Sequence, residues 1–255
     1  MFPDLLDLGF LHLKTYGACM AVGFIVCWSL IERLSGRKDL SNLLVTLMAG
    51  GVIGSRLAYV IEHWQAEFAA DPARIIRVDQ GGLMFYGGLI LSIALFFGWC
   101  LIRRERILSM ADLLTAVVPL GHAFGRLGCF FYGCCYGRDS DAWCAVTFPA
   151  GSPSWFEHGR RAVSVLPTQL FEAVALLALF AALFVLYRKF AATRSGLVTG
   201  VYMIGYGLIR FGIEYLRGDP RAAVGPFSIS QTISIGLILL GVVFGLAAWR
   251  PRPAR

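Results

Sequence analysis

Three arginine side chains interrupt segments that are otherwise apolar. Arg56, Arg126 and Arg210 each lie within such a segment. A charged side chain near the centre of a bilayer costs at least ~2.5–3.5 kcal/mol on insertion scales, so each arginine needs a partner. The acids that we place in comparable segments are Glu172 and Glu214. The surplus of positive charge indicates a bound anion, and a guanidinium matches a phosphate in bidentate geometry.

Within a membrane the abundant anion is the phosphate of a lipid headgroup. An alternative interpretation stays open, in which the arginines reach to the membrane surface or tie helices together through backbone carbonyls. In either case the arginine keeps its charge, because a guanidinium does not release its proton.

A second pattern runs along the segment 197–216. Tyr206, Arg210 and Glu214 are spaced four residues apart, and Arg217 follows Arg210 by seven residues. At 3.6 residues per turn, these side chains share one face of a helix. Lipid offers such a face no partner, so the pattern predicts a polar cavity. The alternative is an Arg210–Glu214 pair that satisfies itself, although this leaves Tyr206 and Arg217 unexplained.

Four of the seven cysteines lie close together in the sequence, namely Cys129, Cys134, Cys135 and Cys144. A disulfide between Cys144 and Cys134 or Cys135 is one interpretation, if this region lies in an oxidising compartment. A zinc site is another, although the C-x4-C-C spacing lacks the C-x2-C pair of common structural sites. The remaining interpretations are a thiol carrier at Cys129 and inert thiols. We predict no metal.

The composition sets the class of protein. Of the 255 residues, 57% are hydrophobic and 15% are charged, against roughly 45–50% and 25% in soluble domains. The mean hydropathy is +0.67. These values exclude a soluble enzyme, a disordered chain and a nucleic-acid-binding domain. The net charge of +7 comes from scattered residues, as is typical of arginines that flank membrane spans.

Apolar segments of about 20 residues are long enough to cross a bilayer. We identify seven of them and predict an all-α integral membrane protein with seven transmembrane helices in a single domain, 1–255. The predicted spans are 15–31, 41–61, 82–102, 112–131, 168–187, 197–216 and 228–249.

The distribution of Lys and Arg predicts the orientation. Cationic residues are densest in the short segments 32–40, 103–111 and 188–196 and after residue 249. By the positive-inside rule these ends face the cytoplasm, so the N-terminus is periplasmic and the C-terminus cytoplasmic. The loop of about 136–166 is then periplasmic. We predict no cleaved signal peptide, because Asp4 and Asp7 stand where a signal carries basic residues.

Seven ordered blocks of the sequence resemble one family, the bacterial phosphatidylglycerol–prolipoprotein diacylglyceryl transferases (Lgt family). The blocks are Tyr16-Gly17, GSRLAYV (54–60), DPARIIRVDQGGLMFYGGLI (71–90), GRLGCFFYGCCYGR (125–138), LPTQLFE (166–172), IGYGLIRFGIEYLRGDP (204–220) and SQTISI (230–235). They extend over almost the whole chain.

The resemblance implies seven transmembrane helices in the bacterial cytoplasmic (inner) membrane. It implies transfer of the diacylglyceryl group of phosphatidylglycerol to the lipobox cysteine of a prolipoprotein, with release of glycerol phosphate and without a cofactor. The positions that match the family's functional residues are Tyr16, Arg126, Gly137, Tyr206, Arg210 and Glu214. We add Arg56, Cys129 and Arg217 as substrate-binding candidates.

The sequence departs from the family pattern at three positions. Tyr86 stands where the family has a histidine, and Cys129 and Cys134 stand where it has an asparagine and an acid. A phenol with a pKa of about 10 is a poor base near neutrality. His122 lies one helical turn before Arg126, so we predict that His122 replaces the missing base and that Tyr86 has a different catalytic role.

We expect a lipoprotein-modifying transferase that acts as a monomer on membrane lipid and a prolipoprotein signal peptide. Two other functions remain open. One is a transferase of the same fold with another acceptor or lipid. The other is a lipid-binding protein or transporter without catalysis, although no internal repeat of the kind common in transporters is visible.

Overall fold

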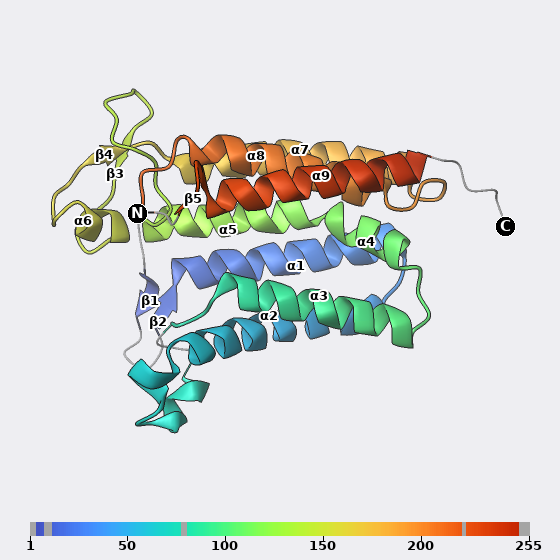
Figure 1. Cartoon of the computed structure of the whole chain (residues 1–255), viewed down its shortest axis with the longest axis horizontal. Helices are drawn as coiled ribbons and strands as arrows, with labels where there is room; N and C mark the ends of the chain where they lie inside the picture. The colour runs from blue at the N-terminus through green and yellow to red at the C-terminus, as the bar shows by residue number, and fades with distance from the viewer. Residues whose placement is uncertain (1–3, 8–11, 78–80, 221–222, 250–255) are drawn as a thin grey trace. The chain divides into compact units, whose positions relative to one another are not determined.

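The computed structural model describes residues 4–7, 12–77, 81–220 and 223–249, and most of them are helical (Figure 1). The α-helices are α1 (Thr15–Ser35), α2 (Leu40–Glu62), α3 (Phe85–Ile102), α4 (Ile107–Thr115), α5 (Val118–Tyr132), α6 (Pro153–Glu157), α7 (Thr168–Phe190), α8 (Leu197–Glu214) and α9 (Ile229–Trp249). A π-helical turn, η1 (Trp64–Phe68), and a 3₁₀ turn, η2 (Pro72–Ile76), follow α2.

The strands are short, and they pair as three antiparallel two-stranded ladders: β1 (Asp4–Asp7) with β2 (His12–Lys14), β3 (Val146–Thr147) with β4 (Ser164–Val165), and β5 (Ala223–Val224) with β6 (Phe227–Ser228).

Six helical segments of the described residues are long and apolar enough to cross a membrane, which makes the chain a multi-pass membrane protein. They are Thr15–Ser35, Leu40–Glu62, Phe85–Ile102, Ile107–Tyr132, Thr168–Phe190 and Ile229–Trp249. The sixth predicted span forms helix α8 at the expected place, with 18 residues. Arg210, Glu214, two tyrosines and four glycines lower its hydropathy. A membrane span at α8, and the orientation of the termini, stay predictions.

The fourth span is broken into two helices, α4 and α5. Pro119 occupies the first turn of α5. Proline has no N–H to donate to the carbonyl four residues earlier, so it ends one helix and begins the next. The Ala116 N–H still bonds to Asp112, whereas the Val117 N–H bonds to Leu114 in a tighter turn.

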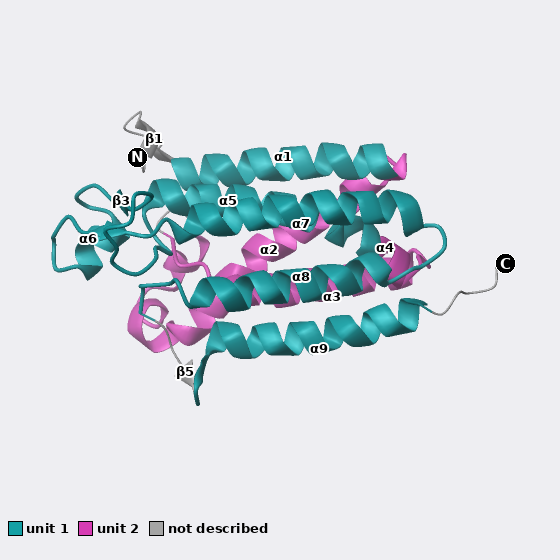
Figure 2. Ribbon diagram, turned by 90° about the horizontal axis from the view of Figure 1, so that it is seen from above, with its two compact units in different colours: residues 1–34, 111–255 teal, residues 35–110 magenta. Residues whose placement is uncertain are grey.

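The chain divides into two compact units, drawn in different colours in Figure 2. One unit comprises residues 1–34 and 111–255, and the other comprises residues 35–110. Each unit has its own helix packing. The predicted single domain stays a prediction.

Within the unit 35–110, glycines allow α2 and α3 to pack backbone against backbone. A Cβ added to Gly54 would lie 2.7 Å from the Cβ of Leu91, and it would also meet the carbonyl of Gly87. Ser92 of α3 donates a hydrogen bond of 3.0 Å to the carbonyl of Leu47. This interface is the tight crossing that small residues at spacings of four favour in membranes.

In the larger unit, glycines again set the closest helix contacts. A Cβ on Gly23 of α1 would lie 2.7 Å from the Cβ of Phe124 in α5. A Cβ on Gly200 of α8 would lie 2.9 Å from the Gly241 carbonyl of α9. Helices α5 and α7 meet through small side chains, because Ala123 and Ala173 belong to one buried cluster.

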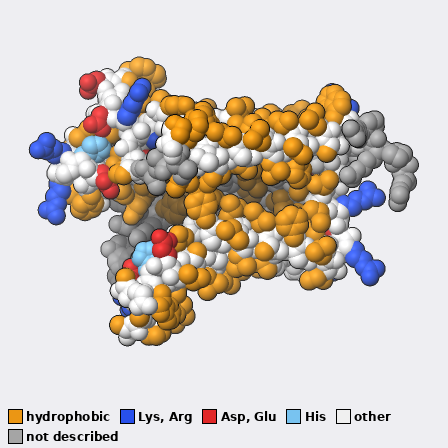
Figure 3. Space-filling model, in the orientation of Figure 1, with side chains coloured by type: hydrophobic (Ala, Val, Ile, Leu, Met, Phe, Trp, Pro, Cys, Tyr) orange, Lys and Arg blue, Asp and Glu red, His pale blue; other side chains and the backbone are white. Residues whose placement is uncertain are grey.

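Hydrophobic side chains cover the flanks of the long helices on the face shown in Figure 3, while charged side chains lie near the helix ends. Ile90 of α3, Val174 of α7 and Leu246 of α9 are each about two-thirds exposed, at 68%, 67% and 68%. Apolar surface of this extent is unfavourable in water and favourable in hydrocarbon. The composition and the surface therefore agree on a membrane environment.

The buried carboxylate of Asp112 fixes the N-terminus of α8. It accepts hydrogen bonds from the Gly196 N–H (2.6 Å), the Thr199 N–H (2.8 Å) and the Thr199 hydroxyl (2.7 Å). Asp112 is 1% exposed. A negative charge here satisfies N–H groups that the first turn of a helix leaves without partners, and it complements the helix dipole.

We predict that Asp112→Ala lowers the melting temperature of the protein in detergent, because it leaves three buried donors without an acceptor at about 1–3 kcal/mol each. Asp112→Asn keeps one acceptor oxygen and lowers the melting temperature less. The exposed Asp141 provides the control, Asp141→Ala. Equal melting temperatures for the Asp112→Ala and Asp141→Ala variants would contradict the anchoring role.

Candidate active site

An ion pair between α5 and α7 lies at the centre of the candidate site. The Nη2 atom of Arg126 is 3.0 Å from Oε1 of Glu172. The Glu172 side chain is fully buried and that of Arg126 is 14% exposed. The small residues of the α5–α7 contact bring the two backbones close enough for this pair to form. Each charge offsets the cost of burying the other.

A second ion pair lies within α8. Arg210 Nη2 is 2.7 Å from Glu214 Oε2, four residues later. The same nitrogen donates a hydrogen bond of 2.8 Å to the hydroxyl of Ser230 in α9. Arg126 and Arg210 are thus each paired with one of the two acids, and the third arginine of the expected surplus, Arg56, binds backbone carbonyls instead.

The two pairs do not use all of their hydrogen-bonding groups. Among the described residues, Arg126 Nε and Arg210 Nη1 are buried and have no hydrogen-bond acceptor. Buried donors without acceptors are rare in native structures, and they indicate a missing partner such as a ligand. An oxyanion is an acceptor that suits either donor, and the carboxylate oxygens of Glu172 and Glu214 are likewise without hydrogen bonds.

His122 and Tyr206 lie beside these arginines. Their ring centroids are 5.2 Å apart, and Tyr206 stacks on Tyr202 at 5.9 Å. His122 is close enough to interact electrostatically with both Arg126 and Arg210. The structure therefore brings together His122, Arg126, Tyr206 and Arg210.

Three cysteines and Tyr16 extend the site at the C-terminal end of α5. The Sγ atoms of Cys129, Cys134 and Cys135 all lie within 4.8 Å of one another. All seven cysteines are free, so the suggested disulfide to Cys144 is not formed. Tyr16 of α1 packs on Gly128, where an added Cβ would lie 2.9 Å from the phenol ring.

A left-handed turn directs the three thiols toward one another. Gly133 ends α5 with φ +80°, and its N–H bonds to the Cys129 carbonyl at 2.9 Å. Cys135 also has a positive φ, +66°. This backbone conformation is uncommon for a residue with a side chain. The positive φ at Cys135 therefore stores strain that neighbouring contacts must hold.

Side chains at the start of α7 provide those contacts. The Thr168 hydroxyl donates to the Cys135 carbonyl at 2.9 Å, and the Gln169 amide donates to the Cys134 carbonyl at 2.7 Å. Both side chains are buried. The sequence does not mark these two residues as functional, although they stand in a matched block, because Thr and Gln at a helix start are also common as caps.

Gly137 is required by close backbone packing. Its N–H donates to the Leu166 carbonyl at 2.8 Å. A Cβ on Gly137 would lie 2.7 Å from the Leu166 side chain and 2.8 Å from the Leu216 carbonyl. Packing thus explains why glycine stands here, and substrate binding by Gly137 stays a prediction.

The predicted helical stripe ends before Arg217, which corrects its placement. Helix α8 stops at Glu214, and Arg217 lies beyond it in a β-bridge with Gly137. Arg217 pairs with Asp219 through two hydrogen bonds of 2.7 Å. Burial raises the pKa of Asp219 above its usual value, although the Arg217 guanidinium opposes this change.

Arg56 fits the alternative of an arginine that binds backbone carbonyls. Its guanidinium donates five hydrogen bonds of 2.6–3.0 Å, which use its five N–H groups. The acceptors are the carbonyls of Arg74, Ile75, Arg77, Gly81 and Gly82. We therefore do not include Arg56 among the residues that bind the lipid phosphate. Arg56 and Tyr86, which is 48% exposed on α3, both belong to the unit 35–110.

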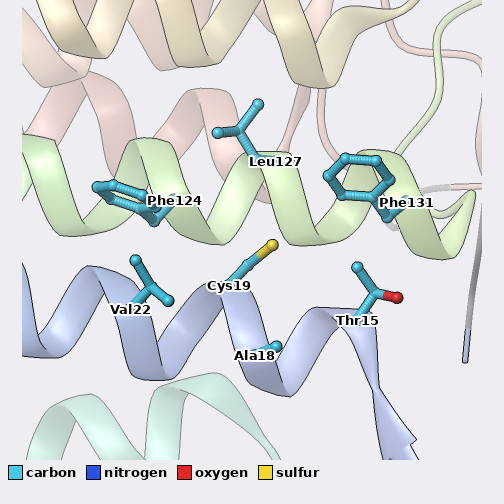
Figure 4. A pocket seen from close by; sticks show the side chains of 7 residues that line it. All are labelled: Thr15, Ala18, Cys19, Val22, Phe124, Leu127 and Phe131. Carbon is cyan, nitrogen blue, oxygen red and sulfur yellow. The ribbon is translucent and has the colours of Figure 1, made fainter. Parts of the chain in front are cut away.

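An apolar cleft of about 340 Å³ lies between α1 and α5. Figure 4 shows Phe124, Leu127 and Phe131 of α5 across from Val22 and Cys19 of α1. Thr15 and Ala18 complete the lining. Its lining residues Thr15 and Leu127 are the sequence neighbours of Tyr16 and Gly128.

The sequence of this multi-pass membrane protein, which contains these buried arginines, phenols and histidine, also matches a known protein family. The family model described as prolipoprotein diacylglyceryl transferase matches residues 3–247. The chain belongs to this family.

Individual members of the prolipoprotein diacylglyceryl transferase family are similar to this chain over nearly their whole length. The chain is 34% identical over 266 residues to the phosphatidylglycerol–prolipoprotein diacylglyceryl transferase of Rhodospirillum rubrum, covering 98% of this chain and 93% of that protein. It is 32% identical over 256 residues to the enzyme of the same name from Clostridium tetani, covering 98% and 99%. The resemblance inferred from the sequence blocks is confirmed.

Proposed function

We propose that this membrane protein is a phosphatidylglycerol–prolipoprotein diacylglyceryl transferase. In this reaction the sulfur of the lipobox cysteine attacks the glyceryl carbon that carries the phosphate. A C–S bond forms, the C–O bond breaks, and glycerol phosphate leaves with the electron pair on its oxygen. The acceptor thiol loses its proton. Family membership supports the reaction, and the site geometry supports the assignment of residues.

The observation that carries the assignment is the pair of buried guanidinium donors without acceptors. Arg126 Nε and Arg210 Nη1 are available to the phosphate, while the remaining charge of each arginine is paired with Glu172 or Glu214. Donors fixed before the reaction stabilise charge that develops on a leaving group. We assign Arg126 and Arg210 to the departing phosphate.

The acceptor thiol needs a group that takes its proton. Glu214 is a weak candidate, because its Oε2 atom already lies 2.7 Å from the Arg210 guanidinium and is held by that ion pair. His122 lies beside Tyr206 and the two arginines. An imidazole nitrogen is the side-chain group that most often serves as a general base. We assign the proton transfer to His122 and a hydrogen-bonding role to Tyr86.

The apolar cleft between α1 and α5 suits an acyl chain of the lipid. Its lining is apolar apart from the Thr15 hydroxyl, and Thr15 and Leu127 of that lining are the sequence neighbours of Tyr16 and Gly128, which pack on each other. We assign this cleft to the lipid donor, with Tyr16 and Tyr206 near the headgroup.

The setting that follows from this function is the cytoplasmic membrane of a bacterium, with seven spans, a periplasmic N-terminus and a cytoplasmic C-terminus. We propose that the enzyme acts as a monomer and that its site opens toward the periplasmic side, where the loop 136–166 lies.

Purified protein, phosphatidylglycerol vesicles and a lipobox peptide separate this function from its alternatives. A peptide carrying a thioether-linked diacylglyceryl group supports the transferase. Lipid turnover without a modified peptide would instead favour a same-fold transferase with another acceptor. Lipid binding without any chemistry would favour a non-catalytic lipid-binding or transport protein.

Arg126→Ala and Arg210→Ala are expected to lower the rate of transfer by about 10²–10³-fold or more, because each removes a donor to the leaving group. Lysine at either position should restore little, since it lacks the planar fork. Because Arg126→Ala leaves Glu172 unpaired, the double variant Arg126→Gln, Glu172→Gln tests the same loss without a buried lone charge. The exposed Arg138→Ala is the control. Near wild-type turnover in Arg210→Ala would refute the phosphate assignment.

His122→Ala should lose most of the turnover at pH 7 and recover part of it at pH 9. A free cysteine with an ordinary pKa of about 8.5 is only a few per cent ionised at pH 7 and mostly ionised at pH 9. Tyr86→Phe should cost less at pH 7. An inactive Tyr86→Phe together with an active His122→Ala would show that His122 is not the base.

The orientation predicts which reagents reach each end of the chain. A cysteine placed at the exposed Asp141, in a Cys144→Ser background, should react with a membrane-impermeant maleimide added to spheroplasts. A reporter fused after Arg255 should be active only in the cytoplasm. Protection of the Asp141→Cys thiol until the membrane is broken would invert the topology.

A further inference from the structure

The three clustered thiols have the geometry of a metal site. The Sγ atoms of Cys129, Cys134 and Cys135 lie within 4.8 Å of one another. Around a tetrahedral zinc ion with Zn–S bonds of about 2.3 Å, the sulfurs are ~3.8 Å apart. Each thiol therefore needs only a small side-chain rotation to become a ligand. All three cysteines are half-buried.

The backbone holds this arrangement without the metal. Gly133 ends α5 in a left-handed conformation, and the Cys134 thiol folds back to within 3.9 Å of the Cys129 carbonyl. Cys135 is kept at φ +66° while Thr168 and Gln169 hold the carbonyls of this turn. A strained backbone that neighbouring residues maintain is typical of functional sites.

The charges around the cluster suit thiolate ligands. Three thiolates and one Zn²⁺ carry a net charge of −1. Arg126 and Arg217 are both close enough to Cys135 to interact with it electrostatically. Within the part of the chain that the structure describes, no His, Asp, Glu or fourth Cys joins the group. Zinc with three protein ligands and an open fourth position is the pattern of catalytic sites, whereas structural sites are closed by four.

We propose that Cys129, Cys134 and Cys135 bind one zinc ion whose open fourth position receives the thiol of the prolipoprotein acceptor. This inference rests on the transferase function proposed above. The zinc ion would activate the acceptor thiol as the nucleophile. It would also place the acceptor sulfur near Arg126, which is assigned to the lipid phosphate.

The step balances without a change of oxidation state. The acceptor thiol displaces a water molecule from zinc and loses its proton, because a coordinated thiol is deprotonated. His122 takes this proton. The bound thiolate attacks the glyceryl carbon, the C–S bond forms, and the C–O bond breaks with its electrons on the phosphate oxygen. The thioether product is a weaker ligand than a thiolate, so it leaves and water returns to Zn²⁺.

Metal content and spectra test the site in the full-length protein, without relying on activity. The protein purified in detergent under reducing conditions should contain one zinc per chain by elemental analysis. Replacement with Co²⁺ should give a thiolate-to-cobalt charge-transfer band. Addition of the lipobox peptide should strengthen that band as a fourth sulfur binds, and a peptide with serine in place of its cysteine should leave it unchanged.

Variants link the metal to the reaction. Cys129→Ser and Cys134→Ser should lose most of the bound zinc and most of the transfer activity while keeping the elution profile of the wild type. Cys144→Ser changes a half-buried cysteine outside the cluster and should keep both. Removal of zinc from the wild type by a chelator should abolish transfer, and added Zn²⁺ should restore it, which tests the proposal even where a variant fails to fold.

Several outcomes would overturn the inference and leave the transferase intact. One is active protein that holds no zinc after reduction and incubation with Zn²⁺. Another is full activity in both the Cys129→Ser and the Cys134→Ser variant. A third is a cobalt band that does not change when the lipobox peptide is added. A protein that binds zinc but transfers no lipid in any form would instead refute the proposed function. A disulfide among the three cysteines that persists in active enzyme would also overturn the zinc site.

Discussion

A guanidinium inside a membrane protein must be paired with an acceptor. Arg126 of α5 is paired with Glu172 of a different helix, α7. The pair forms because Ala123 and Ala173 let α5 and α7 approach closely. It fixes the position of α5 along α7. Both the nitrogen left for a ligand and the thiols at the end of α5 depend on that position.

The fold and the site could be predicted from the sequence wherever the signal is local. Apolar segments of sufficient length predicted six spans that the structure supports, and the remaining one, the sixth along the chain, forms as helix α8. The spacing of Tyr206, Arg210 and Glu214 placed them on one helix, because helical periodicity depends only on nearby residues. Buried charge then marked Arg126 and Arg210, since such residues are costly enough to need a function or a partner.

The remaining features depend on tertiary contacts that sequence spacing does not contain. Arg56 binds five carbonyls of a loop about 20 residues later, which only the folded loop can present. Arg217 leaves the helical stripe because α8 stops at Glu214. Asp112 reaches the start of α8 across 84 residues of sequence. The C-x4-C-C spacing resembles no common zinc motif, and a left-handed turn nevertheless brings the sulfurs together.

The arginines and the cysteine cluster of the candidate site are both explained by the charges that the reaction creates. Before substrate binds, each arginine is paired with a carboxylate, which limits the cost of holding two guanidinium groups among apolar helices. A phosphate then uses donors that these pairs leave free. Attack by sulfur also needs an anion, and a phenol at Tyr86 cannot readily create one. A cation held by the thiols beside Arg126 would stabilise the attacking anion, while the arginines stabilise the departing one. Both charges of the reaction would then be met by groups that the end of α5 positions.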